Sequence, residues 1–279
     1  MIKIKVENEK NVLEYLITNT KFSKNKVKSL LKHKAISING KNNIKHDALL
    51  KKGDLLEISL EKKVTKIKNI DIVYEDENYL VVNKPNGMLT ISTAKERNRT
   101  LYHNVREYIK SKNKRDKIFI VHRLDKETSG IVLFAKKEEL KLKLQENWEK
   151  VAKVREYRAV VLGIMTKKED KLVSYLKENK SNVVYASKSK DGKEAITNYQ
   201  VIKENNNSLL KILIETGRKN QIRVQLNDIG HPILGDKKYG NIKGKKLLLH
   251  ALRLDIRDPL TGKIMSFEAS LPREFLKNL

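Results

Sequence analysis

Apolar and polar positions divide the chain into a short amino-terminal part and a longer part rich in strands. Near the start, VLEYLITN (12–19) and SKNKVKSLLKHK (23–34) space their apolar residues as helices do, with Ser23 placed to cap the second. AISING (35–40) and GDLLEISL (53–60) are instead typical of short strands bounded by turn residues. This pattern predicts a small α+β unit.

The remainder of the chain is dominated by strand-like segments. The predicted strands are DIVYED, NYLVVNKP, IFIV, GIVLFAKK, EYRAVVLG, NVVYAS, AITNYQVI, LLKILIET, KLLLHALRLDI and KIMSFEA, and the predicted helices are LYHNVREYIKS, EELKLKLQENWEKV and KNQIRVQLNDIG. Many strands with few helices predict an α+β domain with a large mixed, mostly antiparallel sheet. The expected organisation is a domain over 1–60, a polar linker over 61–70 and a larger domain over 71–279.

The charge of the chain points to a polyanionic partner. The formal net charge is +26 and the pI is near 9.9, so the protein creates a positive field that attracts nucleic acid. The expected phosphate-binding lysines of the amino-terminal unit are Lys24, Lys26, Lys28 and Lys32. The alternatives are a lysine-rich composition without function and a solvated helix face.

Arginine is informative because the chain otherwise uses lysine. No arginine precedes Arg97, although lysine is abundant in the first seventy residues. A chain that defaults to lysine is expected to retain arginine where a planar, bidentate cation is needed. Arg123, Arg218 and Arg223 are therefore candidate site residues.

Several classes of protein are disfavoured because their sequence motifs are missing. The chain has no cysteine, which excludes disulfides and thiolate chemistry. The six histidines lack metal-site spacing, and no phosphate-binding loop, dinucleotide fingerprint or nucleophile elbow occurs. No apolar run is long enough for a signal peptide or a membrane helix. We expect a cytoplasmic protein without metal or cofactor.

Reactive and charged side chains are concentrated in three segments, HRLDKETSG (122–130), KVREYRAVVLG (153–163) and residues 215–240. Singly, each has an ordinary explanation: Asp125 beside Arg123 suits a surface salt bridge, and Tyr157 suits a half-buried strand. Together, on a basic protein, they indicate a site.

Five segments resemble, in order, the motifs of RluA-type pseudouridine synthases. They are VVNKPNGMLTIS, HRLDKETSG, KVREYRAVVLG, GRKNQIRVQLNDIGHPILGDKKYG and LLLHALRLDIRDP, and the resemblance extends over residues 71–272. Residues 1–60 resemble the small RNA-binding domain named after ribosomal protein S-four. The expected fold is therefore a pseudouridine synthase-like catalytic domain preceded by a small RNA-binding domain.

The resemblance implies conversion of a uridine in structured RNA to pseudouridine, an isomerisation that needs no cofactor. Asp125 would be the catalytic carboxylate, acting as nucleophile or base, and Arg223 would be its ionic partner. Tyr157 would pack on the uracil. The uridine would have to be flipped out of its stack to reach the pocket.

The resemblance also assigns residues to substrate binding. Arg123 would fill the space that the flipped base leaves, and Leu248 would form an aliphatic wall of the pocket. His122, Arg218 and Asn220 complete the expected substrate-binding set. Lys219, Asn220 and Gln225 depart from the GRTHQIRVHL form of many relatives, so we expect altered polar groups near the RNA path.

The expected partner is RNA, with rRNA favoured over tRNA, and we expect a monomer without an obligate protein partner. One alternative is a non-catalytic RNA-binding or ribosome-assembly factor with the same fold. The other is a carboxylate-dependent glycosidase that pairs Asp125 with Asp228 or Asp236.

Overall fold

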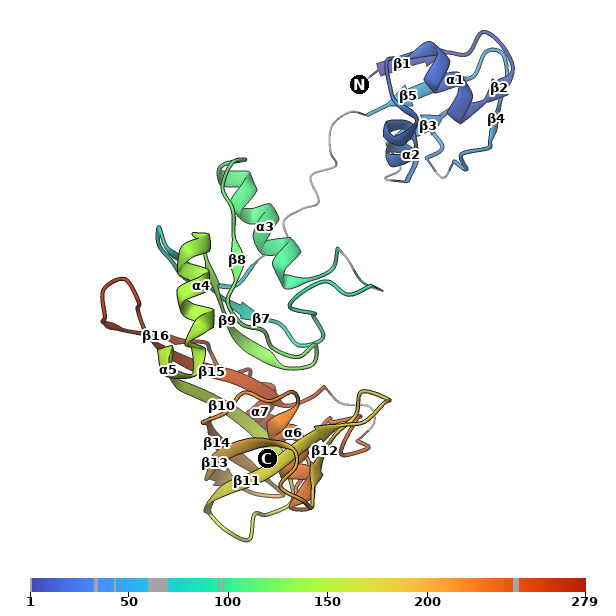
Figure 1. Cartoon of the computed structure of the whole chain (residues 1–279). Coiled ribbons are helices and arrows are strands. Elements are labelled where there is room, and N and C mark those ends of the chain that lie inside the picture. Colours follow the sequence, from blue (N-terminus) through green and yellow to red (C-terminus); the bar gives the residue numbers. More distant parts are fainter. Residues whose placement is uncertain are drawn as a thin grey trace. The chain divides into compact units, whose positions relative to one another are not determined.

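The chain forms two compact units, residues 1–67 and 68–279 (Figure 1). The computed structural model describes residues 2–32, 35–42, 44–59, 70–94, 96, 98–242 and 246–279. Apart from Ile70, the predicted linker lies outside the described residues.

The smaller unit packs two helices against short strands. Its elements are β1 (Ile2–Lys5), β2 (Lys10–Asn11), α1 (Val12–Asn19), α2 (Lys24–Lys32), β3 (Ile36–Ile38), β4 (Leu49–Leu50) and β5 (Leu55–Ile58), with an antiparallel sheet in the order β1-β5-β3 and a β2-β4 pair. The Ser23 hydroxyl accepts a hydrogen bond from the Lys26 amide (3.3 Å), as the sequence predicts for a helix cap. Val12, Leu16 and Val27 lie in one buried core with strand residues.

The larger unit is built on one sheet of eleven strands. The strand order is β12 (Val184–Ser187), β11 (Glu169–Glu178), β13 (Lys193–Glu204), β14 (Asn207–Ile214), β10 (Ala152–Leu162), β15 (Leu249–Arg257), β9 (Ser129–Ala135), β7 (Tyr79–Lys84) and β6 (Ile72–Glu75), with β16 (Ile264–Glu268) on β15 and β8 (Phe119–Ile120) on β9. Its β9–β15 pair is parallel, and the other pairs described are antiparallel. The predicted α+β fold with a mixed, mostly antiparallel sheet is confirmed.

Helices cover both faces of the sheet at β7 and β9 (Figure 1). Helix α3 (Leu101–Lys112) packs on the face that carries Leu80 and Phe134. Helix α4 (Glu138–Glu146) packs on the opposite face, which carries Val81 and Leu133. Because neither face meets water, β9 is a continuous apolar run and not an alternating one.

In the larger unit the structure differs from the sequence prediction at one helix and at one strand. The segment predicted as one helix over 138–151 forms α4 and α5 (Trp148–Val151), separated at Asn147, whose backbone leaves the helical region. The strand β11 was missed because its sequence, EDKLVSYLKE, is rich in charge. Leu176 is the residue of β11 that is fully buried, so the strand lacks the apolar signal of an interior strand.

Helix α6 (Gln221–Asp228) covers the sheet at β10, β13 and β14, with Ile222 and Leu226 in the core. Gly230, in a left-handed conformation (φ 82°), follows its end as predicted. Gln225 is buried under the helix, where its amide bonds the Thr197 hydroxyl and backbone of β11 and β13. The expectation that Gln225 lies near the RNA path is therefore wrong. A last helix, α7, spans Glu274–Lys277.

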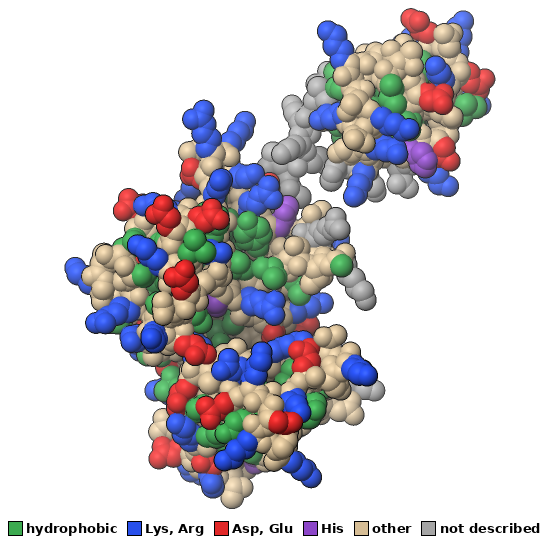
Figure 2. Space-filling model, viewed as in Figure 1, with side chains coloured by type: hydrophobic (Ala, Val, Ile, Leu, Met, Phe, Trp, Pro, Cys, Tyr) green, Lys and Arg blue, Asp and Glu red, His purple; other side chains and the backbone are tan. Residues whose placement is uncertain are grey.

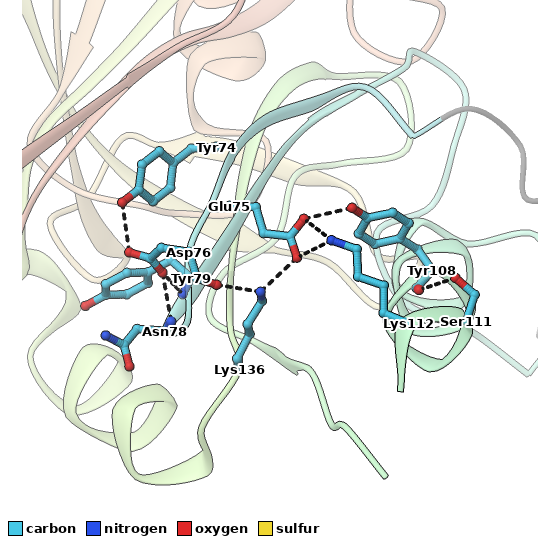
Figure 3. Close-up of polar contacts among 9 residues, drawn as sticks. All are labelled: Tyr74, Glu75, Asp76, Asn78, Tyr79, Tyr108, Ser111, Lys112 and Lys136. Atoms are coloured by element: carbon cyan, nitrogen blue, oxygen red, sulfur yellow. Dashed lines mark hydrogen bonds and ion pairs between the residues drawn. The ribbon is translucent and has the colours of Figure 1, made fainter. Parts of the chain in front are cut away.

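A carboxylate cluster joins β6 to α3 and to the end of β9 (Figure 3). Glu75 accepts hydrogen bonds from the Tyr108 hydroxyl (2.8 Å) and from the ammonium groups of Lys112 (2.9 Å) and Lys136 (2.8 Å). Burial would raise the pKa of Glu75, but these three donors lower it to about 2. The cluster therefore stabilises the fold in its ionised form.

Candidate active site

Four elements of the larger unit converge on one cavity of about 390 Å³: the loop before β9, strands β10 and β15, and helix α6. Because β15 lies between β9 and β10 in the sheet, it brings the loop before β9 close to β10. The predicted site residues that line the cavity are His122, Arg123, Asp125, Tyr157, Arg218, Asn220 and Arg223. A volume of this size suits a single nucleotide base and sugar.

A glycine allows the loop of Asp125 to meet β15 closely. Gly130 has a positive φ of 115°, and a Cβ there would lie 2.2 Å from the carbonyl oxygen of Ala251. Residues other than glycine would clash with that backbone. The glycine of the HRLDKETSG segment is thus required by the parallel pairing of β9 with β15.

Side chains from the end of β7 and from the segment after it bind the backbone of the loop on both sides of Asp125. The Thr90 hydroxyl donates to the Leu124 carbonyl (2.6 Å), and the Leu124 amide is bonded to the same hydroxyl (3.2 Å). The buried Lys84 ammonium donates to the carbonyls of Lys126 (3.1 Å) and Met88 (2.8 Å). These contacts hold the backbone on either side of Asp125 and do not engage its carboxylate.

Lys84 and Thr90 are site residues that the sequence analysis did not identify. Burial lowers the pKa of Lys84 to about 8, against the opposing charges of Asp125 and Glu127. The signal available in the sequence was a lysine ending an apolar strand, immediately before Pro85. That position does not reveal that the side chain turns inward to bind carbonyl groups.

Arg223 does not pair with Asp125, which corrects the expectation from the sequence. Its Nε and Nη2 donate to the two carboxylate oxygens of Asp236, at 2.8 and 2.7 Å, and both side chains are buried. Burial opposes the charge of Arg223, but the bonds to Asp236 and the charges of Asp236 and Asp125 outweigh it and raise the pKa of Arg223. Because Arg223 occupies both oxygens of Asp236, this acid is not available as the second carboxylate of a glycosidase.

Asp125 is half-buried, and within the described residues its carboxylate takes part in no ion pair or hydrogen bond. Its charge nevertheless acts on Arg223, Lys84 and Tyr157. Arg123, two residues earlier, is exposed and also has no carboxylate partner in the described structure. Asp125 and Arg123 are therefore not a surface salt bridge.

Tyr157 enters the cavity from β10, opposite Ala251 of β15. Burial raises the pKa of Tyr157 to about 12, with Arg155 opposing the rise and Asp125 adding to it. The phenol is therefore protonated at neutral pH and offers an aromatic face and a hydroxyl donor.

His122 stacks on Trp148, with ring centroids 4.8 Å apart, and its Nε2 accepts a hydrogen bond from the Leu133 amide (3.1 Å). Burial, assisted by the charge of Arg155, lowers the pKa of His122 to about 4. The imidazole is thus neutral, and it ties the loop to β9 while its ring forms part of the cavity wall.

Leu248 does not line the cavity, so the sequence placed the aliphatic wall one residue too early. Leu248 packs with Val160 and Phe275 in a different core cluster. Leu249, the first residue of β15, lines the cavity instead. Neighbouring residues of an extended chain face opposite sides. An error of one position therefore replaces the residue that lines the cavity by one that packs in the core.

The residues at the start of α6 are held by specific contacts. Asn220 has a left-handed conformation (φ 54°), which asparagine tolerates, and its side-chain oxygen accepts from Arg223 Nη1 (3.2 Å). Arg218 donates from Nε to the Glu194 carbonyl (2.9 Å). Lys219 forms an ion pair with Glu178.

The described residues contain no cluster of three or more His, Asp or Glu side chains that could hold a metal ion. No helix in the described part of the chain is both long enough and apolar enough to span a membrane.

Comparison with known proteins decides the family. Residues 78–228 match the family model described as RNA pseudouridylate synthase. The chain is 31% identical to the uncharacterized RNA pseudouridine synthase YhcT of Bacillus subtilis, over 98% of this chain and 94% of that protein. The chain belongs to the RNA pseudouridylate synthase family. The predicted family, the fold class and the activity of an RNA pseudouridine synthase are confirmed.

Other relatives of this synthase carry more specific names. The chain is 29% identical to the ribosomal large subunit pseudouridine synthase D of Pasteurella multocida, over 92% of this chain and 86% of that protein. Among solved structures, human RNA pseudouridylate synthase domain containing 4 matches with a TM-score of 0.62 at 23% identity, covering 74% of this chain and 90% of that one. That match supports the fold of this synthase.

Proposed function

We propose that this RNA pseudouridine synthase isomerises uridines in ribosomal RNA, with Asp125 as its catalytic group. The observation that carries the assignment is that the Asp125 carboxylate lines the cavity on a loop held by Lys84, while Arg223, its expected cationic partner, is bound to Asp236 instead. A carboxylate kept free of a cation can act as nucleophile or base.

The reaction needs no group beyond those of the cavity. The N1–C1′ bond of the uridine breaks, the uracil turns, and a C5–C1′ bond forms. C5 then loses its proton and N1 gains one, so the product is an isomer of the substrate. Asp125 opens the sequence, as nucleophile or as base.

The other cavity residues bind the flipped uridine. Tyr157 presents its ring to the uracil, and Leu249 provides the aliphatic wall. Arg123, exposed on the loop before Asp125, fills the place of the base in the RNA stack with its planar guanidinium. Ribosomal RNA is favoured as substrate because the relative from Pasteurella multocida bears a ribosomal large subunit name.

The smaller unit binds RNA backbone in this proposal, as its resemblance to S-four domains implies. Helix α2 buries Val27 and Leu30 and exposes Lys24, Lys26, Lys28 and Lys32. In the described part of the unit, none of these four lysines pairs with a carboxylate. The protein acts as a monomer in the cytoplasm. Basic side chains are spread over the visible face of both units (Figure 2).

The test is a transcriptome-wide map of pseudouridine in cells that contain the protein, lack it, or carry Asp125→Asn. We expect one or more rRNA uridines to lose modification in both the deletion and the substituted strain. A site in tRNA alone would reject the substrate class. No dependent site in any RNA would favour the non-catalytic assembly factor.

A further inference from the structure

Arg155 is a buried cation of the cavity that has no role in the function proposed above. It lies on β10 two residues before Tyr157, so both side chains project from the same face of the strand and line the same cavity. Only 9% of Arg155 is exposed.

The hydrogen bonds of Arg155 are incomplete. Its Nη2 donates to the carbonyl of Glu215 (2.6 Å), while its Nε is buried and has no acceptor among the described residues. No carboxylate of the described structure forms an ion pair with it. A buried donor without an acceptor and a buried cation without a counter-ion both cost stability, which indicates that a ligand supplies the anion.

The other cations of the cavity differ from Arg155. Arg123 is exposed, and the rest are paired: Arg223 with Asp236, Arg253 with Asp255, Lys219 with Glu178 and Arg218 with Glu149. The pair of Arg218 with Glu149 is long, at 3.8 Å, and partly exposed, so a ligand can replace Glu149 at little cost.

Arg155 and Arg218 are neighbours, held close by a glycine. A Cβ at Gly217 would lie 3.1 Å from Arg155 Nη1, so the absence of a side chain there lets the backbone before Arg218 rest on the guanidinium. Burial depresses the pKa of Arg155; the charges of Tyr157 and Glu149 oppose this, and the charge of Arg218 adds to it. Two adjacent guanidinium groups are suited to one phosphate.

We propose that Arg155 and Arg218 together bind one phosphodiester of the RNA strand beside the flipped uridine, with Arg155 as the buried contact. This inference rests on the proposed RNA substrate. A uracil ring is neutral and cannot compensate the charge, whereas the phosphate attached to the same nucleotide can. Arg155 is thus a substrate-binding residue that positions the nucleotide while Tyr157 contacts its base.

Trp148, the one tryptophan of the chain, lines this cavity, so its fluorescence reports binding there. Uridine and uridine 5′-monophosphate are titrated against wild-type protein, Arg155→Gln, Arg155→Lys and a control, Arg115→Gln, which removes an exposed charge outside the cavity lining. Wild type and control should bind the monophosphate more tightly than uridine, by roughly tenfold. Arg155→Gln should lose this preference and Arg155→Lys should keep part of it, while both retain the uridine affinity.

Equal affinities for the two ligands in wild-type protein, or a full preference in Arg155→Gln, would overturn the proposal. If Arg155→Gln does not fold, Arg155→Lys decides, since a full preference in that variant also overturns it. Pseudouridine formation is measured separately on rRNA from cells that lack the protein. A preference for the monophosphate without pseudouridine formation would reject the proposed function and leave the phosphate contact standing.

Discussion

Arg223 donates two hydrogen bonds to Asp236, of 2.8 Å from Nε and 2.7 Å from Nη2, and thereby leaves Asp125 without a bound cation. A direct ion pair would place the guanidinium on the carboxylate that we propose as the catalytic group. The observed arrangement instead fixes Arg223 with one acid and lets its charge act on the other from a distance. Asp236 is thus part of the site through Arg223, although it does not line the cavity.

Asp236→Ala should therefore reduce both stability and activity. Removing one partner of a buried pair leaves Arg223 as an uncompensated charge, which costs about 3 kcal/mol of unfolding free energy. Urea unfolding and single-turnover pseudouridine formation measure the two effects. Asp228→Ala, which removes an exposed acid on the helix that carries Arg223, is the matched control and should change neither. Unchanged activity in Asp236→Ala would show that Arg223 does not need this anchor.

Asp125→Asn should lower the rate of pseudouridine formation by at least about a thousandfold. The free energy of unfolding should stay within about 0.5 kcal/mol of the wild-type value. Stability should be retained because the carboxylate has no bonded partner in the described structure, so replacing it with an amide breaks no contact. Binding of unmodified RNA should be retained. Asp116→Asn, at an exposed position, serves as the control. A stability loss of several kcal/mol would mean that Asp125 is a structural acid.

Lys84→Met should destabilise the protein by about 2 kcal/mol, because backbone carbonyls of the Asp125 loop and of the segment after β7 lose their donor. The carbonyls concerned are those of Pro85, Met88 and Lys126. Turnover should also fall, since the loop that presents Asp125 is no longer fixed. Thermal unfolding and single-turnover rates are compared with Lys126→Met, which alters an exposed lysine. Wild-type values for Lys84→Met would contradict the role assigned to the ammonium.

Glu75 should make the fold sensitive to acid. Its pKa is about 2 in the folded protein against 4.5 as the ordinary value, so its contribution is complete above pH 4.5 and is lost as the pH falls toward 2. A shift of this size corresponds to at most about 3 kcal/mol, and partial exposure reduces it to about 2 kcal/mol. Glu75→Gln should lose that stability at pH 7 and show a weaker decline between pH 4.5 and 2.

The pH dependence is followed by urea unfolding at fixed pH values. Glu77→Gln alters an exposed neighbour and should follow the wild-type curve. Parallel curves for wild type and Glu75→Gln would indicate that Lys112 and Lys136 do not stabilise the ionised carboxylate.

Replacing the four lysines of α2 by glutamine should weaken RNA binding and its dependence on salt. Each lysine that contacts a phosphate adds slightly less than one to the slope of log affinity against log salt, so the slope should fall by up to about three. The four positions are Lys24, Lys26, Lys28 and Lys32. Single-turnover chemistry at saturating RNA should change little. An unchanged slope would count against phosphate contacts by this helix.

The sequence by itself determined the element types and the family. Apolar periodicity marked the two helices of the smaller unit and the strands of the sheet, because burial on one or both faces leaves a regular trace. The ordered motifs predicted residues, from His122 to Arg223, that the structure brings together around one cavity. Strand β11 was not predicted because most of its residues are exposed or only partly buried, and the periodic spacing of apolar residues arises from burial.

Only the tertiary structure decided which charged residues of the site pair with each other and which apolar residues line the cavity. Asp236 follows Arg223 by thirteen residues, and no local pattern shows that a chain turn brings the two together. The choice of Leu249 over Leu248 depends on which side of β15 meets the cavity, which three consecutive leucines cannot reveal. The inward turn of Lys84 and the incomplete bonding of Arg155 likewise arise from partners distant in sequence, since burial and hydrogen bonding are set by the packed fold.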